Sequence, residues 1–102
     1  MLKLTVMYPN NEDLKFDKEY YINKHSQLLK DLLGDALVSF DVNFGISGSN
    51  PGEPAPYFVI ANLVFESMES FEKSFGAHSE RIGGDLSNFS NVKPEIQLSE
   101  VV

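Results

Sequence analysis

The sequence predicts an α+β domain in which four strands and two helices follow one another in the order βαββαβ. With 102 residues the chain has room for one domain with one hydrophobic core, so we expect a single domain over residues 1–102. Two stretches show the helical period of apolar residues behind a capping residue. Four others show the alternation or the continuous apolarity of strands. Together these observations predict the fold class.

Alternation and capping residues mark the first strand and the first helix. Leu2 to Tyr8 alternates, with its apolar residues on one face, until Pro9-Asn10-Asn11 interrupts the pattern. A helix is predicted from about Lys18 to Leu33, because Asp17 is a favourable N-cap and Gly34 suits the position after the last turn. The apolar stripe of this helix has His25 at its centre and otherwise consists of Tyr21, Leu28, Leu29 and Leu32.

The second and third strands are expected on either side of a long loop. Ala36 to Phe44 alternates and predicts a strand whose inward residues are Ala36, Val38, Phe40, Val42 and Phe44. Gly45 to Pro56 is rich in Gly, Ser and Pro and predicts the loop. Tyr57 to Phe65 is apolar on both faces, which is typical of a central strand that is covered on both sides.

The last third of the chain predicts a short helix and a final strand. Ser67 is the expected N-cap of a helix with Met68, Phe71 and Phe75 on one face, and Gly76 is expected to end or kink it. After Pro94, Ile96 and Leu98 alternate with polar residues and predict the last strand.

This order predicts a ferredoxin-like domain with a four-stranded antiparallel sheet. Right-handed crossovers place both helices on one face, with the first and third strands at the centre. The other face is then left bare, although the third strand is apolar there too. A patch of that size is unusual on a monomer, so we expect a homodimer in which a second copy covers it.

Composition and charge exclude several classes of function. The chain has no Cys, which excludes disulfides, thiolate metal sites and a Cys nucleophile. Fifteen acidic and eight basic residues give a net charge of −7, which disfavours nucleic acid and anionic membrane surfaces as partners. No apolar run is long enough to span a membrane, and the strand pattern that begins at Leu2 leaves no room for a signal peptide. We therefore expect a cytoplasmic protein.

His25 and His78 are the candidate residues for proton transfer near neutral pH, because they are the only His residues of a chain without Cys. His25 is expected on the core-facing side of the first helix. The alternative to a catalytic role there is a structural His bonded to a backbone carbonyl. His78 lies in a polar, Gly-containing stretch, and taken alone it fits a surface His better than a pocket residue. Asp85 and Asn88 follow in the same stretch and could orient an imidazole or serve in turns.

The sequence shows no pattern for a metal or a nucleotide cofactor. Two His residues on separate elements lack the spacing of a metal site such as HExxH. Gly45-x-x-Gly48 lacks the strand-turn-helix context and the third Gly of a dinucleotide loop. We therefore expect chemistry without a metal or a cofactor.

The chain resembles the EthD family over nearly its whole length, through LKLTVMYPN, KEYYINKHSQLL, FESMESFEKSFGAHSERIGGDLSNF and PEIQLSEVV. That family's motif Tyr-x-x-Lys-His-x-Pro is similar to the stretch from Tyr21 to Gln27, where Gln27 replaces Pro. A second family motif, Phe-Gly-x-His followed by Asp and Asn-Phe, matches Phe75, Gly76, His78, Asp85, Asn88 and Phe89. Both His residues thus occupy motif positions.

The resemblance implies a dimeric α+β barrel with a pocket between helices and sheet. It also implies a small apolar or aromatic metabolite as partner, bound by Tyr21, Leu28, Phe71, Phe75, Asp85, Asn88 and Phe89, with His25 and His78 as catalytic residues. Such a protein would be a cofactor-independent oxidoreductase of monooxygenase type, or a polyketide cyclase or isomerase. The alternative is a non-catalytic protein that binds such a metabolite as an accessory of a degradation pathway. Fold similarity does not choose between these functions.

Overall fold

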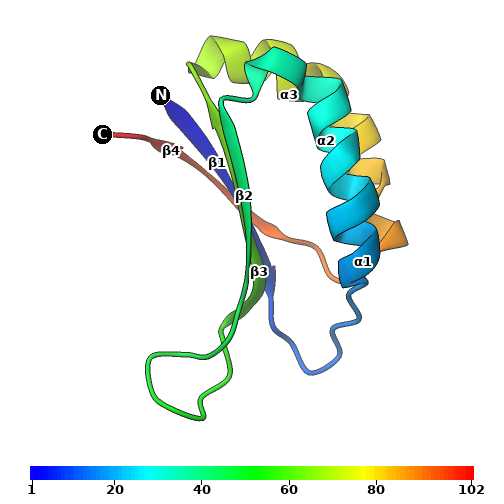
Figure 1. Cartoon of the computed structure of the whole chain (residues 1–102), viewed down its shortest axis with the longest axis vertical. Coiled ribbons are helices and arrows are strands. Elements are labelled where there is room, and N and C mark those ends of the chain that lie inside the picture. The colour runs from blue at the N-terminus through cyan, green and yellow to red at the C-terminus, as the bar shows by residue number, and fades with distance from the viewer.

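The computed structural model describes residues 1–102 and confirms the predicted fold class. Its antiparallel strands are β1 (Leu2–Pro9), β2 (Ser39–Phe44), β3 (Tyr57–Phe65) and β4 (Glu95–Glu100), in the spatial order β2-β3-β1-β4. All helices lie on one face of this sheet, and the loop between β2 and β3 extends beyond its end (Figure 1). The first and third strands are central, as predicted, and the topology is ferredoxin-like.

The first helix has the predicted bounds but an unexpected middle. It consists of α1 (Lys18–Tyr20), the π-helical segment η1 (Tyr21–His25) and α2 (Ser26–Leu33), which follow one another without a break. The Asp17 side chain caps its start by accepting a hydrogen bond from the backbone N–H of Tyr20 at 3.1 Å. Gly34 ends the helix with a φ of 52°, a conformation that favours glycine.

The second helix, α3 (Met68–Gly84), has 17 residues, and the expectation that it ends or kinks at Gly76 was wrong. A glycine inside a helix costs about 1 kcal/mol relative to alanine. The apolar stripe continues past it, since Phe75 and Ile82 both pack into the core on the same side of the helix. This packing outweighs the cost of Gly76. Ser67 is the N-cap, as predicted.

The second strand starts later than predicted. After Gly34 the chain forms a short 3-10 helix, η2 (Gly34–Ala36), so Ala36 lies in a turn rather than in β2. Val38, expected to face inward, is exposed. The remaining inward residues, Phe40, Val42 and Phe44, are half-buried as part of β2. Ala36 and Val38 continue the alternation of β2 in the sequence, but they belong to the turn that follows the first helix.

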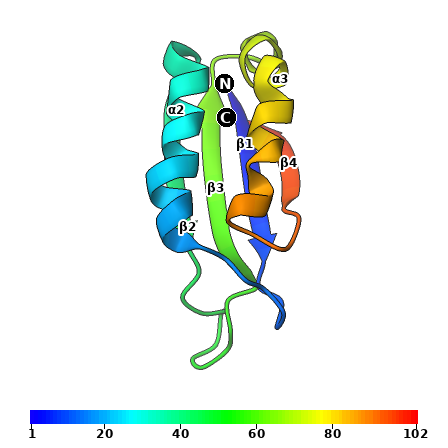
Figure 2. The ribbon, with the colours of Figure 1, turned by 90° about the vertical axis from the view of Figure 1, so that its right-hand side faces the viewer.

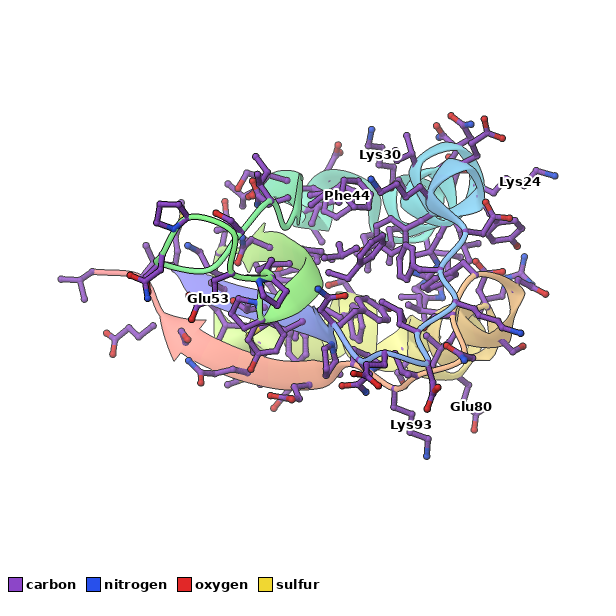
Figure 3. The ribbon with its side chains drawn as sticks, turned by 90° about the horizontal axis from the view of Figure 1, so that it is seen from below. Lys24, Lys30, Phe44, Glu53, Glu80 and Lys93 are labelled. Carbon is purple, nitrogen blue, oxygen red and sulfur yellow. The ribbon has the colours of Figure 1, made fainter.

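The core fills the space between the sheet and the helices. Figure 2 shows α2 and α3 side by side over β3 and β1. One cluster of buried residues lies near the chain termini and consists of Leu2, Leu4, Leu29, Leu33, Ala61, Leu63, Phe65 and Ile82. A second, mostly aromatic cluster contains Tyr8, Tyr21, Val59 and Phe89. In Figure 3 side chains fill this interior, whereas Lys24, Lys30, Glu80 and Lys93 point outward.

The opposite face of the sheet is more polar than the sequence suggested. The expectation that β3 is apolar on both faces overlooked Asn62 at the middle of that face. Asn62 accepts a hydrogen bond from the Thr5 hydroxyl at 3.0 Å and donates one to the Asp41 carboxylate at 3.3 Å. Ile60 and Val64 flank it and are half-buried. A row of paired polar groups therefore crosses the helix-free face.

None of the helices combines the length and the hydropathy that crossing a lipid bilayer requires.

Candidate functional site

A cavity of about 240 Å³ lies between the sheet and the helices. Ten of its 14 lining residues are hydrophobic, which is typical of sites for small organic molecules. Its wall is formed by β1, β3, β4, both helices and the segment between α3 and β4, through Val6, Tyr8, Tyr21, His25, Leu29, Leu63, Phe75, Ser79, Ile82, Gly83, Leu86, Phe89, Pro94 and Ile96. The cavity is therefore where a ligand would meet side chains from most elements of the fold.

The π-helical segment places two polar residues of this wall. Tyr21 and His25 are the first and last residues of η1, and both are buried. The backbone N–H and the hydroxyl of Ser26 both donate to the Tyr21 carbonyl, and the backbone bond spans five residues instead of the four of an α-helix. Such segments occur frequently at functional sites.

The Asp85 carboxylate receives three hydrogen bonds where α3 ends. One oxygen, Oδ2, lies 2.8 Å from Nδ1 of His25. The other, Oδ1, accepts from the Tyr20 hydroxyl at 2.6 Å and from the Asn88 amide at 2.9 Å. Asn88 stands in the 3-10 helix η3 (Leu86–Asn88), directly after Asp85. Residues from both helical regions thus hold one carboxylate against one imidazole.

Backbone contacts fix the two regions relative to each other. The backbone N–H of Asp17, at the start of the first helix, donates to the Phe89 carbonyl at 2.8 Å, and Phe16 pairs with Ser90. The Phe89 ring lies 4.6 Å from the His25 ring and 5.0 Å from the Tyr21 ring, measured between centroids. The imidazole is therefore held on one side by an aromatic ring and at one nitrogen by a carboxylate.

Burial lowers the pKa of His25 below its ordinary value, although the hydrogen bond and the charge of Asp85 work in the opposite direction. Partial burial raises the pKa of Asp85, but the hydrogen bonds from Tyr20, Asn88 and His25 outweigh it and lower that pKa overall. At neutral pH the pair is therefore a neutral imidazole beside an ionised carboxylate. Because a carboxylate can only accept, Nδ1 carries the proton and Nε2 has a free lone pair.

Nε2 of His25 has no hydrogen-bond partner and is not completely buried. No hydrogen bond involves this atom. In the side chains that are not exposed, every nitrogen or oxygen without accessible surface has a hydrogen-bond partner. Nε2 must therefore retain accessible surface, and His25 lines the cavity. A neutral imidazole with one nitrogen oriented by a carboxylate and the other free to accept a proton is the arrangement of a general base.

The structure brings together most of the residues that the sequence predicted for the site. His25, Tyr21, Phe75 and Phe89 line the cavity. Asp85 and Asn88 lie behind His25 and do not line it. Leu28 and Phe71 are half-buried and lie outside the cavity wall; Phe71 packs against the core beside Phe65.

His78 is not brought to the cavity. It is half-buried on α3 and is absent from the wall, where Phe75, Ser79, Ile82 and Gly83 represent this helix. The prediction that His78 shares a pocket with His25 assumed that the chain leaves the helix at Gly76. Because α3 continues, its residues point in directions set by the helical period, and Ser79 rather than His78 faces the cavity.

Sequence reasoning missed Tyr8 and Tyr20. Tyr8 was predicted to lie on the apolar side of the first strand, and that alternation could have identified it as a cavity residue. Tyr20 carried no such signal, since its role depends on the position of Asp85, which lies 65 residues further along the chain. No three His, Asp or Glu side chains cluster anywhere in the structure, so the site offers no evident ligand set for a metal ion.

The fold and this site define a ferredoxin-like domain with an apolar cavity and a His–Asp pair at its wall. The EthD domain model matches residues 10–92, and the chain belongs to the EthD family. The EthD-like protein from Ralstonia eutropha JMP134 is 35% identical, with a TM-score of 0.92 over 99% of this chain and 91% of that one. A search of the curated proteins found no match.

Two further solved structures share the fold at lower identity. An ethyl tert-butyl ether d (EthD) family protein from Bacillus halodurans C-125 is 21% identical, with a TM-score of 0.76 over 100% of this chain and 99% of that one. HapK from Hahella chejuensis is 16% identical, with a TM-score of 0.59 over 100% of this chain and 93% of that one. At these identities the likeness shows the fold alone.

Proposed function

We propose that this EthD-family protein is an enzyme that removes a proton from a small, mostly apolar molecule bound between helices and sheet. One observation carries this proposal: the buried imidazole of His25 is bonded through Nδ1 to the ionised Asp85, its Nε2 has no hydrogen-bond partner, and the residue lines an apolar cavity. In the reaction, Nε2 takes the proton and its electron pair stays on the substrate. Proton removal of this kind begins cyclase- and isomerase-type reactions.

Asp85 stabilises the step without losing its own charge. The imidazolium that forms on proton transfer lies 2.8 Å from the carboxylate, which keeps its two other hydrogen bonds from Tyr20 and Asn88. The attraction between these opposite charges is stronger in a site from which water is largely excluded than in water. Burial opposes the charged imidazole and Asp85 favours it, so the base stays neutral until a substrate supplies the proton.

Hydrogen–deuterium exchange tests this proposal without knowledge of the natural substrate. One- and two-ring ketones, 2-tetralone among them, are incubated with the protein in deuterated buffer, and exchange beside the carbonyl is followed by NMR. We expect the wild-type protein to accelerate exchange, and His25→Gln to lose about 10²–10⁴-fold of that acceleration. His78→Gln is the matched control, because His78 lies outside the cavity wall, and it should retain the acceleration.

The alternative is a protein that binds its ligand without changing it. In that case the ketones bind, exchange stays at the rate in buffer, and His25→Gln alters affinity or stability only. Equal exchange with the wild type and His25→Gln, or an equal loss with His78→Gln, would likewise contradict the assignment of His25 as the base.

A further inference from the structure

Two tyrosines that line the cavity have hydroxyls without a hydrogen-bond partner. Tyr8 and Tyr21 are 3% and 1% exposed, and both line the cavity. No hydrogen bond involves either hydroxyl, whereas Tyr20 and Tyr57 both donate to carboxylates. Since no completely buried polar side-chain atom of this structure lacks a partner, both hydroxyls retain accessible surface. Because both residues line the cavity, we infer that this surface faces it.

These two hydroxyls remain hydrogen-bond donors over the whole physiological pH range. Burial raises the pKa of Tyr21 well above its ordinary value. Burial also raises the pKa of Tyr8, and the nearby Tyr21 raises it further. The two rings lie 6.1 Å apart between centroids, at an interplanar angle of 82°. The wall thus offers two neutral donors on neighbouring rings, and the Tyr21 ring lies 5.2 Å from the His25 ring between centroids.

The cavity has no side chain that could neutralise a charged ligand. Its lining contains no Lys, Arg, Asp or Glu, and His25 is neutral. The Asp85 carboxylate behind His25 and the net charge of −7 would repel an anionic ligand. A ligand that is charged when free would lose its hydration without gaining an ion pair. The absence of charged side chains in the wall and the negative charge around it therefore favour a neutral ligand.

The volume of the cavity favours a ligand of one or two rings. A cavity of about 240 Å³ exceeds the roughly 150 Å³ of an engineered protein cavity that binds benzene. It lies below the roughly 300–1,000 Å³ that is usual for drug-sized ligands. The wall is also rich in aromatic rings, since Tyr8, Tyr21, Phe75 and Phe89 all contribute to it.

Building on the proposed role of His25, we propose that the hydroxyls of Tyr8 and Tyr21 together bind one oxygen atom of the substrate. The substrate is then a neutral one- or two-ring compound with a hydroxyl or carbonyl group. When Nε2 of His25 takes the proton, negative charge develops on this oxygen, and two donors already in place stabilise it. No other group is consumed or released in the step.

Three probes that differ in one group test the inference by titration calorimetry or fluorescence. They are naphthalene, 2-naphthol and 2-naphthoate, which share a two-ring skeleton. We expect the wild type to bind 2-naphthol more tightly than naphthalene, by roughly three- to tenfold for each tyrosine hydroxyl, and to bind 2-naphthoate most weakly. Tyr8→Phe and Tyr21→Phe should each lose that factor for 2-naphthol and leave naphthalene unchanged.

Tyr57→Phe and His78→Gln are the control variants. The Tyr57 hydroxyl donates to Glu95 outside the cavity wall, so its removal should not affect any probe. His78 also lies outside the wall, so His78→Gln should leave the affinity for all three probes unchanged. The measurement reports binding and not proton exchange, which separates this inference from the assignment of the base. Any of four results would overturn the inference. The wild type could bind naphthalene and 2-naphthol equally, bind 2-naphthoate tightly, or fail to bind 2-naphthol, or both tyrosine variants could keep the wild-type affinity for 2-naphthol. The wild-type comparisons hold even if a variant fails to fold.

Discussion

Replacing Asp85 by Ala tests whether its carboxylate holds His25 in the neutral, Nδ1-protonated form. The change removes the acceptor of a ring that is 5% exposed, and a buried donor without a partner costs about 1–3 kcal/mol. Tyr20 and Asn88 lose the same acceptor, but Asn88 is exposed and Tyr20 is half-buried, so both can bond to water instead. We therefore expect the free energy of unfolding to fall by about 1–3 kcal/mol.

The same substitution should change the pH dependence of stability. The pKa of His25 is already below its unfolded value because of burial, and loss of Asp85 lowers it further. Between the two pKa values the unfolded chain binds a proton that the folded protein does not. Stability is thus complete above a pH of about 6.5 and is lost as the pH falls below that value. In Asp85→Ala this loss should continue to lower pH than in the wild type.

Urea unfolding at several pH values, together with an NMR titration of the His25 ring, measures both effects. Asp85→Asn is the control, because it keeps an oxygen acceptor of similar size while removing the charge, and it should lose less stability than Asp85→Ala. Below a pH of about 4 the protonation of Asp85 itself affects the wild type, so the comparison is made above pH 5. Unchanged stability and an unchanged His25 titration in Asp85→Ala would refute the role given to this carboxylate.

Three further predictions concern the fold. Leu4 lies in the core, so Leu4→Ala should lower the free energy of unfolding in urea by about 2–5 kcal/mol. Ile46 is 96% exposed in the loop, so Ile46→Ala should stay within about 0.5 kcal/mol of the wild type. Equal effects of the two substitutions would contradict the assigned core. Amides of β3, which is paired on both sides, should exchange with deuterium far more slowly than those of Gly45 to Pro56, and comparable rates would mean a wrong strand order. Light scattering should give about twice the chain mass of 11.4 kDa, because a second copy can cover the helix-free face without breaking the Asn62 hydrogen bonds; the mass of one chain would refute the dimer.

Local patterns were sufficient to predict the architecture. The alternation of Leu2 to Tyr8, the Asp17 cap and the largely apolar run from Tyr57 to Phe65 each depend on neighbours in sequence, and each gave the right element. The errors arose where packing overrides a local preference. Gly76 has a low helix propensity, but the apolar residues on both sides of it pack into the core and keep α3 intact.

The candidate site was predictable only in part, for a related reason. His25 could be identified because an imidazole at the centre of an apolar stripe is unusual, and the helix that carries it had clear ends. The contact between His25 and Asp85 joins residues 60 positions apart, and no spacing in the sequence indicates it. The error for His78 followed from the error at Gly76, since the end of a helix decides which residues after it face the core.

The π-helical segment makes the length of the first helix part of the site. Each residue of an α-helix turns the chain by about 100°, and a π-helical segment accommodates an extra residue without a break. Deleting the exposed Ile22 would remove no core contact, yet it would allow regular α-helical bonding and rotate Tyr20 and Tyr21 relative to His25. A homologue with a one-residue gap at this point would therefore keep the tyrosines, His25 and Asp85 and still lose the site. In alignments of the family, such a gap carries as much functional information as a substitution of His25 or Asp85.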